Sequence, residues 1–247
     1  MFPLRDYVPR LHHPIAVWGI IGVNVLFFLY AMGLDQVELN RLFHVLGVVP
    51  ARYFQPEWAQ WMGYPRGGSV AFLAHMFLHS GFFHFVLNMW ILWVFADNVE
   101  DVMGPGRFIV FYVLCGLGAL GAHLLFHAHS EVPVVGASGA IAGVMGAYLL
   151  LYPHARVLTL IPIFFIPYFL DLPAVLFLGL WFAMQVLSGV LAGLEGGSGA
   201  GVAWWAHAGG FVMGMVLIPF FRVPSRCYYC HTRTRGGRGG GDSFRFD

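Results

Sequence analysis

Lysine is absent from this chain of 247 residues, and charged residues of all kinds make up only 10% of it. A soluble domain usually carries about 25% charged residues, so this deficit excludes a surface that is solvated by water. Hydrophobic residues reach 59%, and the mean hydropathy is +0.72. The composition therefore predicts a polytopic membrane protein, and we expect an all-α fold embedded in a lipid bilayer.

Cysteine is also scarce, with three residues in the chain, and it says little about folding. Cys115 stands alone in an apolar segment, where it is expected to be a small core residue. Residues 227–231, Cys-Tyr-Tyr-Cys-His, match the C-x-x-C-H pattern of haem attachment. The tail that holds them is predicted to be cytoplasmic, whereas c-type haem is attached outside the cytoplasm. We interpret the run as accidental or as a weak metal-binding tail, and we expect no cofactor.

Six apolar segments are spaced along the chain, and we expect each to form a transmembrane helix. The segments cover about 14–34, 83–101, 107–127, 134–152, 173–193 and 201–221. The predicted organisation is an N-terminus at 1–13, a six-helix membrane domain at 14–221 and a tail at 222–247. The tail is basic and rich in glycine and arginine, so we expect it to be disordered.

Two connections differ from a short loop between helices. Residues 35–68 mix acids and arginines with tryptophan and tyrosine, whose side chains favour the membrane–water interface. We expect this long loop, between the first and second helices, to be structured and partly submerged in the bilayer. Residues 154–172 are apolar but are interrupted by Pro162, Pro167 and Asp171, and they receive no assignment.

The distribution of arginine predicts the orientation. All thirteen basic residues are arginine, and ten of them fall on the side of the membrane that holds both termini. The other three, Arg41, Arg52 and Arg66, lie in the long first loop. The positive-inside rule therefore predicts that both termini are cytoplasmic. We further expect a multi-pass protein of the inner (plasma) membrane, of bacterial origin.

This orientation places three polar side chains at similar depth. The segments of Ser138 and His207 both enter the membrane from the outer face, and His84 lies near the outer end of its segment. A serine hydroxyl becomes a useful nucleophile when a base removes its proton, and histidine suits that task. Asp97 and Glu100 fall toward the cytoplasmic end of their segment. We therefore expect a Ser138–His207 dyad rather than a triad.

Acyl transfer also needs hydrogen-bond donors for the oxyanion that develops on the substrate. His84 and Asn88 stand one turn apart on one helix face, so with the backbone N–H of Ser138 they could supply such donors. Gly136 and Gly139 flank the serine, where the absence of Cβ leaves room for a substrate backbone and frees N–H groups. We therefore assign Gly136 to the oxyanion site and expect Gly139 to support that site structurally.

Helix packing offers a simpler explanation for some of these residues. A transmembrane serine usually bonds a carbonyl of its own helix or a neighbouring helix. Small residues at 139 and 143, and at 206, 210 and 214, are ordinary signals of close approach between helices. Both explanations can hold at once, because close packing through Gly139 and Gly210 would bring the fourth and sixth segments together.

Three histidines before and within the second segment invite a metal site. His75, His79 and His84 are spaced i, i+4, i+9, which does not place three ligands on one helix face. We therefore expect no metal ion. The alternative for His75 and His79 is a structural role, in which these polar groups tie the first loop to the helices.

Taken together, these residues resemble the rhomboid family of intramembrane serine proteases. The resemblance spans about 69–221 and rests on motifs that occur in order along the chain. They are 75–79 (His-Met-Phe-Leu-His), His84-x-x-x-Asn88, 136–139 (Gly-Ala-Ser-Gly) and 206–210 (Ala-His-Ala-Gly-Gly). The resemblance implies that Ser138 is the nucleophile and His207 the general base. It also implies that His84 and Asn88 line the oxyanion site and that Glu100 is a structural hydrogen-bonding residue.

The substrates implied by this resemblance are other membrane proteins, cut in or near a transmembrane helix that unwinds at the site. Water would reach the serine through a cavity open to the outer face. Some members carry an aromatic residue four positions after the serine, stacked on the histidine, whereas this chain has Ala142, so His207 must be oriented otherwise. Some also carry a Trp-Arg pair in the first loop, whereas here Trp61 and Arg66 are apart.

Two other functions compete with the protease. A non-enzymatic chaperone or scaffold that binds transmembrane helices would keep its function when Ser138 is replaced by alanine. A small transporter would be expected to show inverted repeats, and no paired broken helices occur at corresponding positions. We expect no nucleic-acid partner, and the oligomeric state and the natural substrate stay open.

Overall fold

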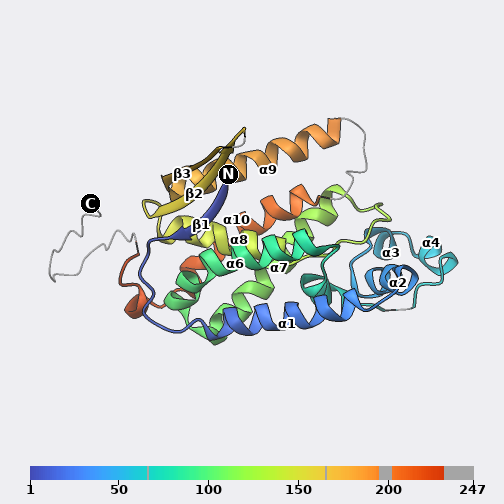
Figure 1. Ribbon diagram of the computed structural model, residues 1–247. Coiled ribbons are helices and arrows are strands. Elements are labelled where there is room, and N and C mark those ends of the chain that lie inside the picture. The colour runs from blue at the N-terminus through green and yellow to red at the C-terminus, as the bar shows by residue number, and fades with distance from the viewer. Residues whose placement is uncertain (66, 165, 195–201, 231–247) are drawn as a thin grey trace.

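A bundle of apolar helices forms the body of the molecule in the computed structural model, which describes residues 1–65, 67–164, 166–194 and 202–230 (Figure 1). Six helices lie where the apolar segments predict them: α1 (Ile15–Met32), α6 (Phe82–Met103), α7 (Pro105–Phe126), α8 (Ser138–Leu151), α9 (Ala174–Leu194) and α10 (Trp204–Phe221). Within the described residues, five are long and apolar enough to cross a membrane, and α8 is shorter at 14 residues. The polytopic helical bundle is therefore confirmed.

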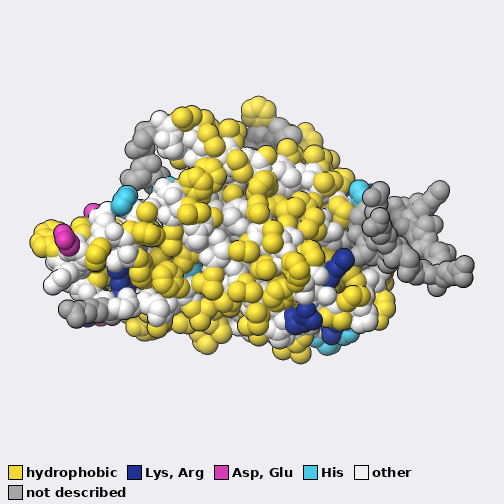
Figure 2. Space-filling model, turned by 180° about the vertical axis from the view of Figure 1, so that it is seen from behind, with side chains coloured by type: hydrophobic (Ala, Val, Ile, Leu, Met, Phe, Trp, Pro, Cys, Tyr) yellow, Lys and Arg dark blue, Asp and Glu magenta, His cyan; other side chains and the backbone are white. Residues whose placement is uncertain are grey.

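Side chains on the outside of the bundle fit a lipid environment. Hydrophobic side chains cover the middle of the face in Figure 2, and charged side chains lie toward its two ends. Arg107 and Arg226 both lie at the end that carries the C-terminal segment, where they donate to the carbonyl oxygens of Phe220 and Asp101. The apolar middle is what a membrane-embedded surface requires.

Helix α8 forms the centre of the bundle, because eleven of its 14 residues are buried between α6, α7 and α10. Glycines let α8 and α10 approach closely. A Cβ on Gly210 would lie 2.0 Å from the carbonyl oxygen of Gly139, and one on Gly214 would lie 1.8 Å from that of Gly143. The close packing that the small-residue pattern predicts for these helices is therefore present.

The start of α8 differs from the prediction. The fourth segment was expected from residue 134, but the helix begins at Ser138. Residues before it are extended, since Val134 exchanges backbone hydrogen bonds with Val48, at 2.8 and 3.1 Å. Gly136 then adopts a φ of 130°, a conformation that side chains other than glycine rarely allow. Ser138 is consequently the first residue of α8 rather than one turn inside it.

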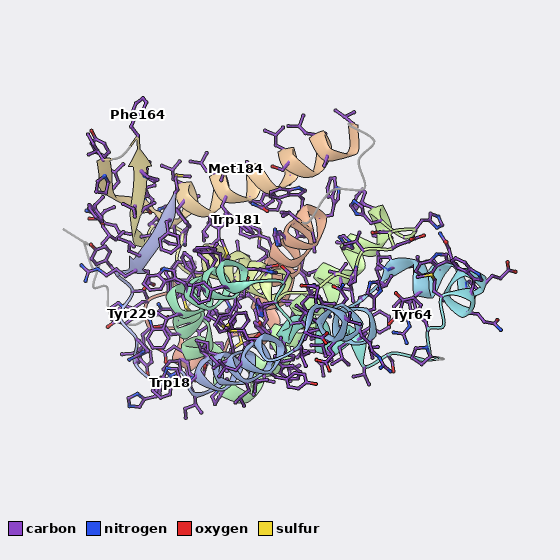
Figure 3. All side chains as sticks on the ribbon, turned by 45° about the vertical axis from the view of Figure 1, so that its right-hand side comes forward. Trp18, Tyr64, Phe164, Trp181, Met184 and Tyr229 are labelled. Carbon is purple, nitrogen blue, oxygen red and sulfur yellow. A yellow bond between two sulfur atoms is a disulfide. The ribbon has the colours of Figure 1, made fainter. Side chains whose placement is uncertain are left out.

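A three-stranded antiparallel sheet is an addition to the expected all-α fold. Residues 154–172, which received no assignment, form the hairpin of β2 (Arg156–Ile163) and β3 (Ile166–Pro173). β1 (Phe2–Asp6) pairs with β2, which gives the order β1-β2-β3. Prolines oppose continuous helix here, while the isoleucine, valine, threonine and aromatic residues favour strands. Phe164, at the tip of the hairpin, is 92% exposed and projects away from the bundle (Figure 3).

The first loop is structured, as its composition predicts, and lies at the opposite end of the bundle from the sheet (Figure 1). It contains α2 (Gln36–Leu46), α3 (Pro50–Phe54) and α4 (Pro56–Trp61). The short helix α5 (Ala71–Ala74) and the 3-10 turn η1 (His75–Phe77) follow it and lead to α6. Buried Arg52 joins its parts by donating to the carbonyl oxygen of Pro65 at 3.0 Å. Trp61 is 82% exposed, as suits a side chain at the membrane interface.

The beginning of the tail is ordered against the bundle, in contrast to the expected disorder of residues 222–247. After the turn η2 (Pro224–Arg226), a disulfide joins Cys227 and Cys230. The backbone N–H of Val223 donates to the carbonyl oxygen of Val102 at 2.8 Å. The disulfide leaves neither sulfur as a thiolate ligand for haem or zinc. Residues 231–247 lie outside the described residues, so the disorder expected of them stays a prediction.

Glu100 closes the N-terminus of α1. Its buried carboxylate accepts hydrogen bonds from the backbone N–H groups of Ala16 and Val17, at 3.0 and 2.8 Å. Pro14, at the N-cap position, provides no capping side chain of its own. An acceptor supplied by α6 therefore satisfies donors that the helix itself cannot satisfy.

We expect Glu100→Ala to destabilise the folded protein, because it leaves two buried N–H groups without an acceptor. Each such group costs about 1–3 kcal/mol. The thermal midpoint in detergent should fall by about 5 °C or more, and by less in Glu100→Gln, which keeps one acceptor oxygen. An unchanged midpoint in Glu100→Ala would show that the cap contributes nothing.

Candidate active site

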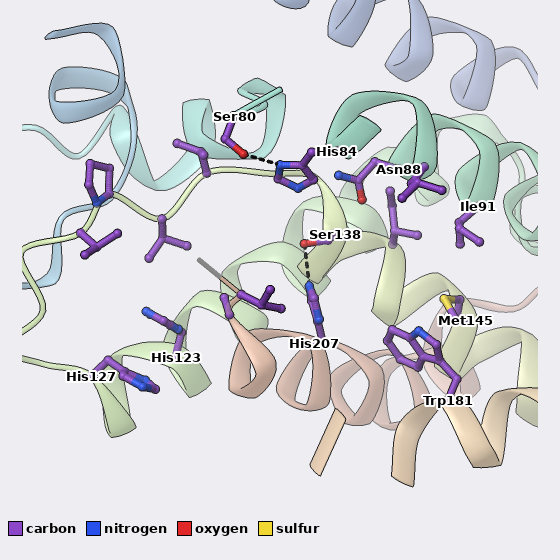
Figure 4. A pocket seen from close by; sticks show the side chains of 18 of the residues that line it. Ser80, His84, Asn88, Ile91, His123, His127, Ser138, Met145, Trp181 and His207 are labelled. Carbon is purple, nitrogen blue, oxygen red and sulfur yellow. Dashed lines mark hydrogen bonds between the residues drawn. The ribbon is translucent and has the colours of Figure 1, made fainter. Parts of the chain in front are cut away.

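Ser138 and His207 meet at the same end of two closely packed helices. Ser138 is the first residue of α8, and His207 lies in the first turn of α10, rather than about two turns into its helix. Their side chains are joined by a hydrogen bond of 2.8 Å between Ser138 Oγ and His207 Nε2 (Figure 4). The structure therefore brings together the two residues that the sequence places on separate segments.

Gln185 of α9 completes this arrangement, and the sequence analysis missed it. Its Oε1 atom lies 2.8 Å from His207 Nδ1, on the opposite side of the imidazole from Ser138. An amide oxygen only accepts hydrogen bonds, so Nδ1 must carry the proton. Nε2 is then unprotonated and can accept the hydrogen of the serine hydroxyl. Gln185 thus fixes the tautomer that a general base requires.

Aromatic rings from two helices surround the imidazole of His207. The ring of Trp181 on α9 lies 6.1 Å from it, and that of Trp204 on α10 lies 6.4 Å away at a right angle. Ala142 is buried in α8 and offers no ring. Gln185 and Trp181 therefore account for the orientation of His207, which Ala142 cannot provide.

His84 and Asn88 lie on the α6 side of the serine. Ser80 Oγ is 3.0 Å from His84 Nδ1, which leaves His84 Nε2 directed toward Gly136. Asn88 is 7% exposed, and its Nδ2 donor has no hydrogen-bond partner. A buried donor without a partner is costly unless a ligand supplies the acceptor. Asn88 and His84 line the same cavity as Ser138 (Figure 4).

The two glycines beside the serine act differently from the prediction. The N–H of Gly136 donates to the carbonyl oxygen of His75 at 2.8 Å, so it is not free to bind an oxyanion. A Cβ on Gly136 would lie 2.9 Å from the imidazole of His84, so this glycine makes room for His84. A Cβ on Gly139 would lie 2.6 Å from Ala119, so Gly139 serves helix packing rather than substrate access.

His75 and His79 are buried beside the site without joining the dyad. His75 Nδ1 lies 3.1 Å from the carbonyl oxygen of Ala71, which ties the α5 turn together. Burial, aided by the neighbouring His84, lowers the pKa of His79 to about 3, so its ring is neutral. In the described part of the chain, no three His, Cys, Asp or Glu residues are placed to hold a metal ion.

A cavity of about 800 Å³ lies beside the dyad. Its walls come from α6 to α10, the segments just before α6, α8 and α10, and the N-terminal residues. Fifteen of the 23 lining residues are apolar, and Ser138, His207 and Asn88 are among the eight polar ones. Such a cavity can hold several residues of an apolar peptide with a carbonyl group next to the serine.

Comparison with known proteins gives consistent results. "Rhomboid protein 1, mitochondrial" of Saccharomyces cerevisiae is 27% identical over 168 residues, which cover 64% of this chain and 44% of that protein. "Putative rhomboid protease YdcA" of Bacillus subtilis is 34% identical over 92 residues, which cover 36% of this chain and 44% of that protein. "Rhomboid protease GluP" of the same organism is 39% identical over 77 residues, covering 31% and 15%.

The chain spans less than half the length of each of these relatives. A family model described as the Rhomboid domain matches residues 66–223 of this chain. That match includes α6 to α10, and with them Ser138, His207, Gln185, His84 and Asn88. Since it covers well over half of the 247 residues, this chain belongs to the rhomboid family.

Proposed function

We propose that this chain is an intramembrane serine endopeptidase that cuts other membrane proteins in or near a transmembrane helix. The proposal rests chiefly on a chain of two hydrogen bonds, each of 2.8 Å. One joins Ser138 Oγ to His207 Nε2, and the other joins His207 Nδ1 to Gln185 Oε1. The dyad lies at a cavity within a bundle of membrane-spanning helices. Two of the relatives are named as proteases, which agrees with this function.

In this mechanism, Ser138 Oγ attacks the carbonyl carbon of the scissile bond while His207 Nε2 accepts the hydroxyl proton. The negative charge passes to the carbonyl oxygen. Asn88 Nδ2 and the N–H of Ser138 donate to that oxygen, with His84 beside them. The N–H of Ser138 is available because the first residues of a helix have no acceptor within it.

The remaining steps use the same groups. The imidazolium of His207 returns its proton to the leaving amine, and the C–N bond breaks to leave an acyl ester on Ser138. Water then attacks this ester with His207 again as the base. Gln185 is neutral, so it holds the imidazole in place but offers less charge stabilisation than the carboxylate of a triad.

The cellular setting is part of the proposal. The arginines Arg107, Arg222 and Arg226 lie at the end of the bundle opposite the dyad, and Arg10 pairs with Asp97 at 3.8 Å toward the same end of α6. The positive-inside rule then makes this end cytoplasmic, with the start of α1 and the end of α10 on that side. We propose a bacterial plasma membrane, although some relatives are mitochondrial.

Cleavage of a defined substrate tests the proposal. Purified protein in detergent should cut a single-span membrane protein into two fragments whose new ends lie in or next to the transmembrane segment. Fragments cut only in the extramembrane parts would point to a contaminating protease. Unchanged binding of the substrate without cleavage would favour the scaffold function over the protease.

Asn88→Ala should lower kcat by about a hundredfold or more, because an oxyanion donor contributes most in the transition state. KM should change little, since the donor has no partner before the oxyanion forms. Steady-state cleavage of the single-span substrate measures both constants. Val86→Ala, at a half-exposed position on the same helix, is the matched control and should retain activity. An equal fall in both variants would contradict this role.

Gln185→Ala should lower kcat by about tenfold to a hundredfold, because His207 loses the acceptor that fixes its tautomer. Gln185 acts only through His207, so it is a positioning residue. Gln185→Glu keeps an acceptor at Nδ1 and should restore much of the rate, with a changed pH profile. Met184→Ala, at an exposed position on α9, is the control. Full activity in Gln185→Ala would show that the contact is incidental.

A further inference from the structure

The N-terminal strand reaches into the wall of the cavity that holds the dyad. Met1, Phe2 and Pro3 line this cavity together with Ser138 and His207. The indole Nε1 of Trp90 donates to the carbonyl oxygen of Pro3 at 2.7 Å, and the ring of Phe2 stacks on Trp90 at 5.7 Å. An extended segment of this chain therefore lies against α6, the helix that carries His84 and Asn88.

On its other side, the strand is added to the edge of a hairpin. β1 pairs with β2 from Val157 to Leu160, with a shift in register between Pro3 and Arg5. β2 continues to Ile163 and pairs with β3 along its whole length. The described pairing therefore leaves part of the β2 edge uncovered, next to the cavity end of β1.

One of the contacts that hold β1 is costly. Asp6 Oδ2 accepts hydrogen bonds from Tyr148 Oη at 2.6 Å and from Asn98 Nδ2 at 2.7 Å. Burial raises the pKa of Asp6 from 3.8 to about 7, so ionisation of this carboxylate opposes docking of the strand progressively as the pH rises from 3.8 to about 7, and fully above that. Pro3 has no N–H to donate to the sheet. The buried carboxylate and the missing N–H both weaken the binding of β1, so another strand can displace it.

The surroundings of the hairpin indicate which kind of segment could replace β1 at the edge of β2. Phe164, Phe169 and Leu170 are 92%, 58% and 46% exposed, so the hairpin is surrounded by apolar material. A peptide bond inside a helix cannot reach the serine until that helix unwinds, and in lipid the freed N–H and C=O groups need partners. A free strand edge supplies them through strand addition.

We propose that the edge of β2, with Trp90 of α6, is the binding site for the unwound transmembrane segment of a substrate, and that residues 2–6 occupy it as a tethered competitor. This inference rests on the proposed protease function. The occupant has the character of such a substrate, since Phe2, Pro3 and Leu4 are apolar and their backbone is extended. Substrate must displace β1 before its scissile bond can reach Ser138.

A disulfide lock tests the competitor directly. Arg5 and Leu158 are opposed across the antiparallel pair, at a spacing that a disulfide can bridge. Oxidised Arg5→Cys/Leu158→Cys protein should cleave a single-span substrate at least tenfold more slowly than the same protein after reduction. Labelling of Ser138 by a small fluorophosphonate should be equal in the two forms. The single Arg5→Cys variant, treated in the same way, controls for effects on the native disulfide.

Equal cleavage by the oxidised and reduced forms, or a parallel loss of labelling, would overturn the inference. If neither the wild type nor the variant is labelled or cleaves, the proposed function fails and the inference falls with it. Phe2→Asp provides the opposite change, because it places a charge against Trp90. Because the altered strand no longer competes with substrate, the apparent KM should fall several-fold with kcat unchanged, whereas Leu11→Ala, at an exposed position outside β1, should have no effect. A loss of activity in Phe2→Asp would instead make β1 a purely structural strand.

Discussion

Ser138→Ala, His207→Ala and the double variant should all cleave a single-span membrane substrate at the same background rate. In the proposed mechanism the hydroxyl and the imidazole, which share a hydrogen bond of 2.8 Å, act in one step, so losing either removes the whole covalent mechanism. The effects of substituting residues that act as a unit do not add, so each variant, single or double, should show kcat lowered by about 10⁴-fold or more. Initial rates of cleavage by equal amounts of folded protein measure the effect.

Each of these variants must first be shown to fold. Both side chains lie at the cavity rather than in the centre of the packed helices, so the thermal midpoint should stay close to that of the wild type. Substantial cleavage in Ser138→Ala would contradict the mechanism and indicate another nucleophile. A double variant much slower than either single variant would show that the two residues act independently.

Gly214→Ala should prevent the bundle from packing. The added Cβ would lie 1.8 Å from the carbonyl oxygen of Gly143, and a backbone atom inside buried α8 cannot move aside as a flexible side chain can. We expect a loss of about 3 kcal/mol or more in unfolding free energy, or no folded protein at all. Unfolding in mixed micelles, or the thermal midpoint in detergent, measures the change.

Gly121→Ala is the matched control for this substitution. Gly121 also lies within a membrane-spanning helix, α7, but a Cβ there would meet nothing within 4 Å. Alanine is the better helix former, so stability should be unchanged or slightly higher. A similar loss in both variants would show that close contact between α8 and α10 is not what stabilises the bundle.

Hydropathy predicted the helices well because a segment that spans lipid must be apolar and must satisfy its own backbone hydrogen bonds, which a helix does. The predicted segment at 83–101 corresponds to α6 at Phe82–Met103, and the segment at 173–193 corresponds to α9 at Ala174–Leu194. The sequence did not predict the hairpin of β2 and β3, because both strands are mostly apolar and show no regular alternation of polar and apolar residues. Its partner, β1, is also more than 150 residues away in sequence, and no local pattern reports such pairing.

Sequence reasoning found the residues with distinctive chemistry and missed their supports. Ser138 and His207 stood out as polar groups inside apolar segments, and topology placed them at one depth. Gln185 stands inside an apolar helix in the same way, and this was the signal that could have found it. The backbone conformation of Gly136 could not be foreseen, because it depends on contacts with His75 and His84 from distant parts of the chain.

Fluorophosphonate labelling tests the central claim most directly, because it needs no knowledge of the substrate. Such a probe reacts with a serine hydroxyl that a base has activated, and mass spectrometry of the digested protein identifies the modified residue. We predict modification of Ser138 in the wild type, a strong decrease in His207→Ala and none in Ser138→Ala. Absence of labelling in folded wild type, or equal labelling in all three proteins, would contradict an activated serine at this site.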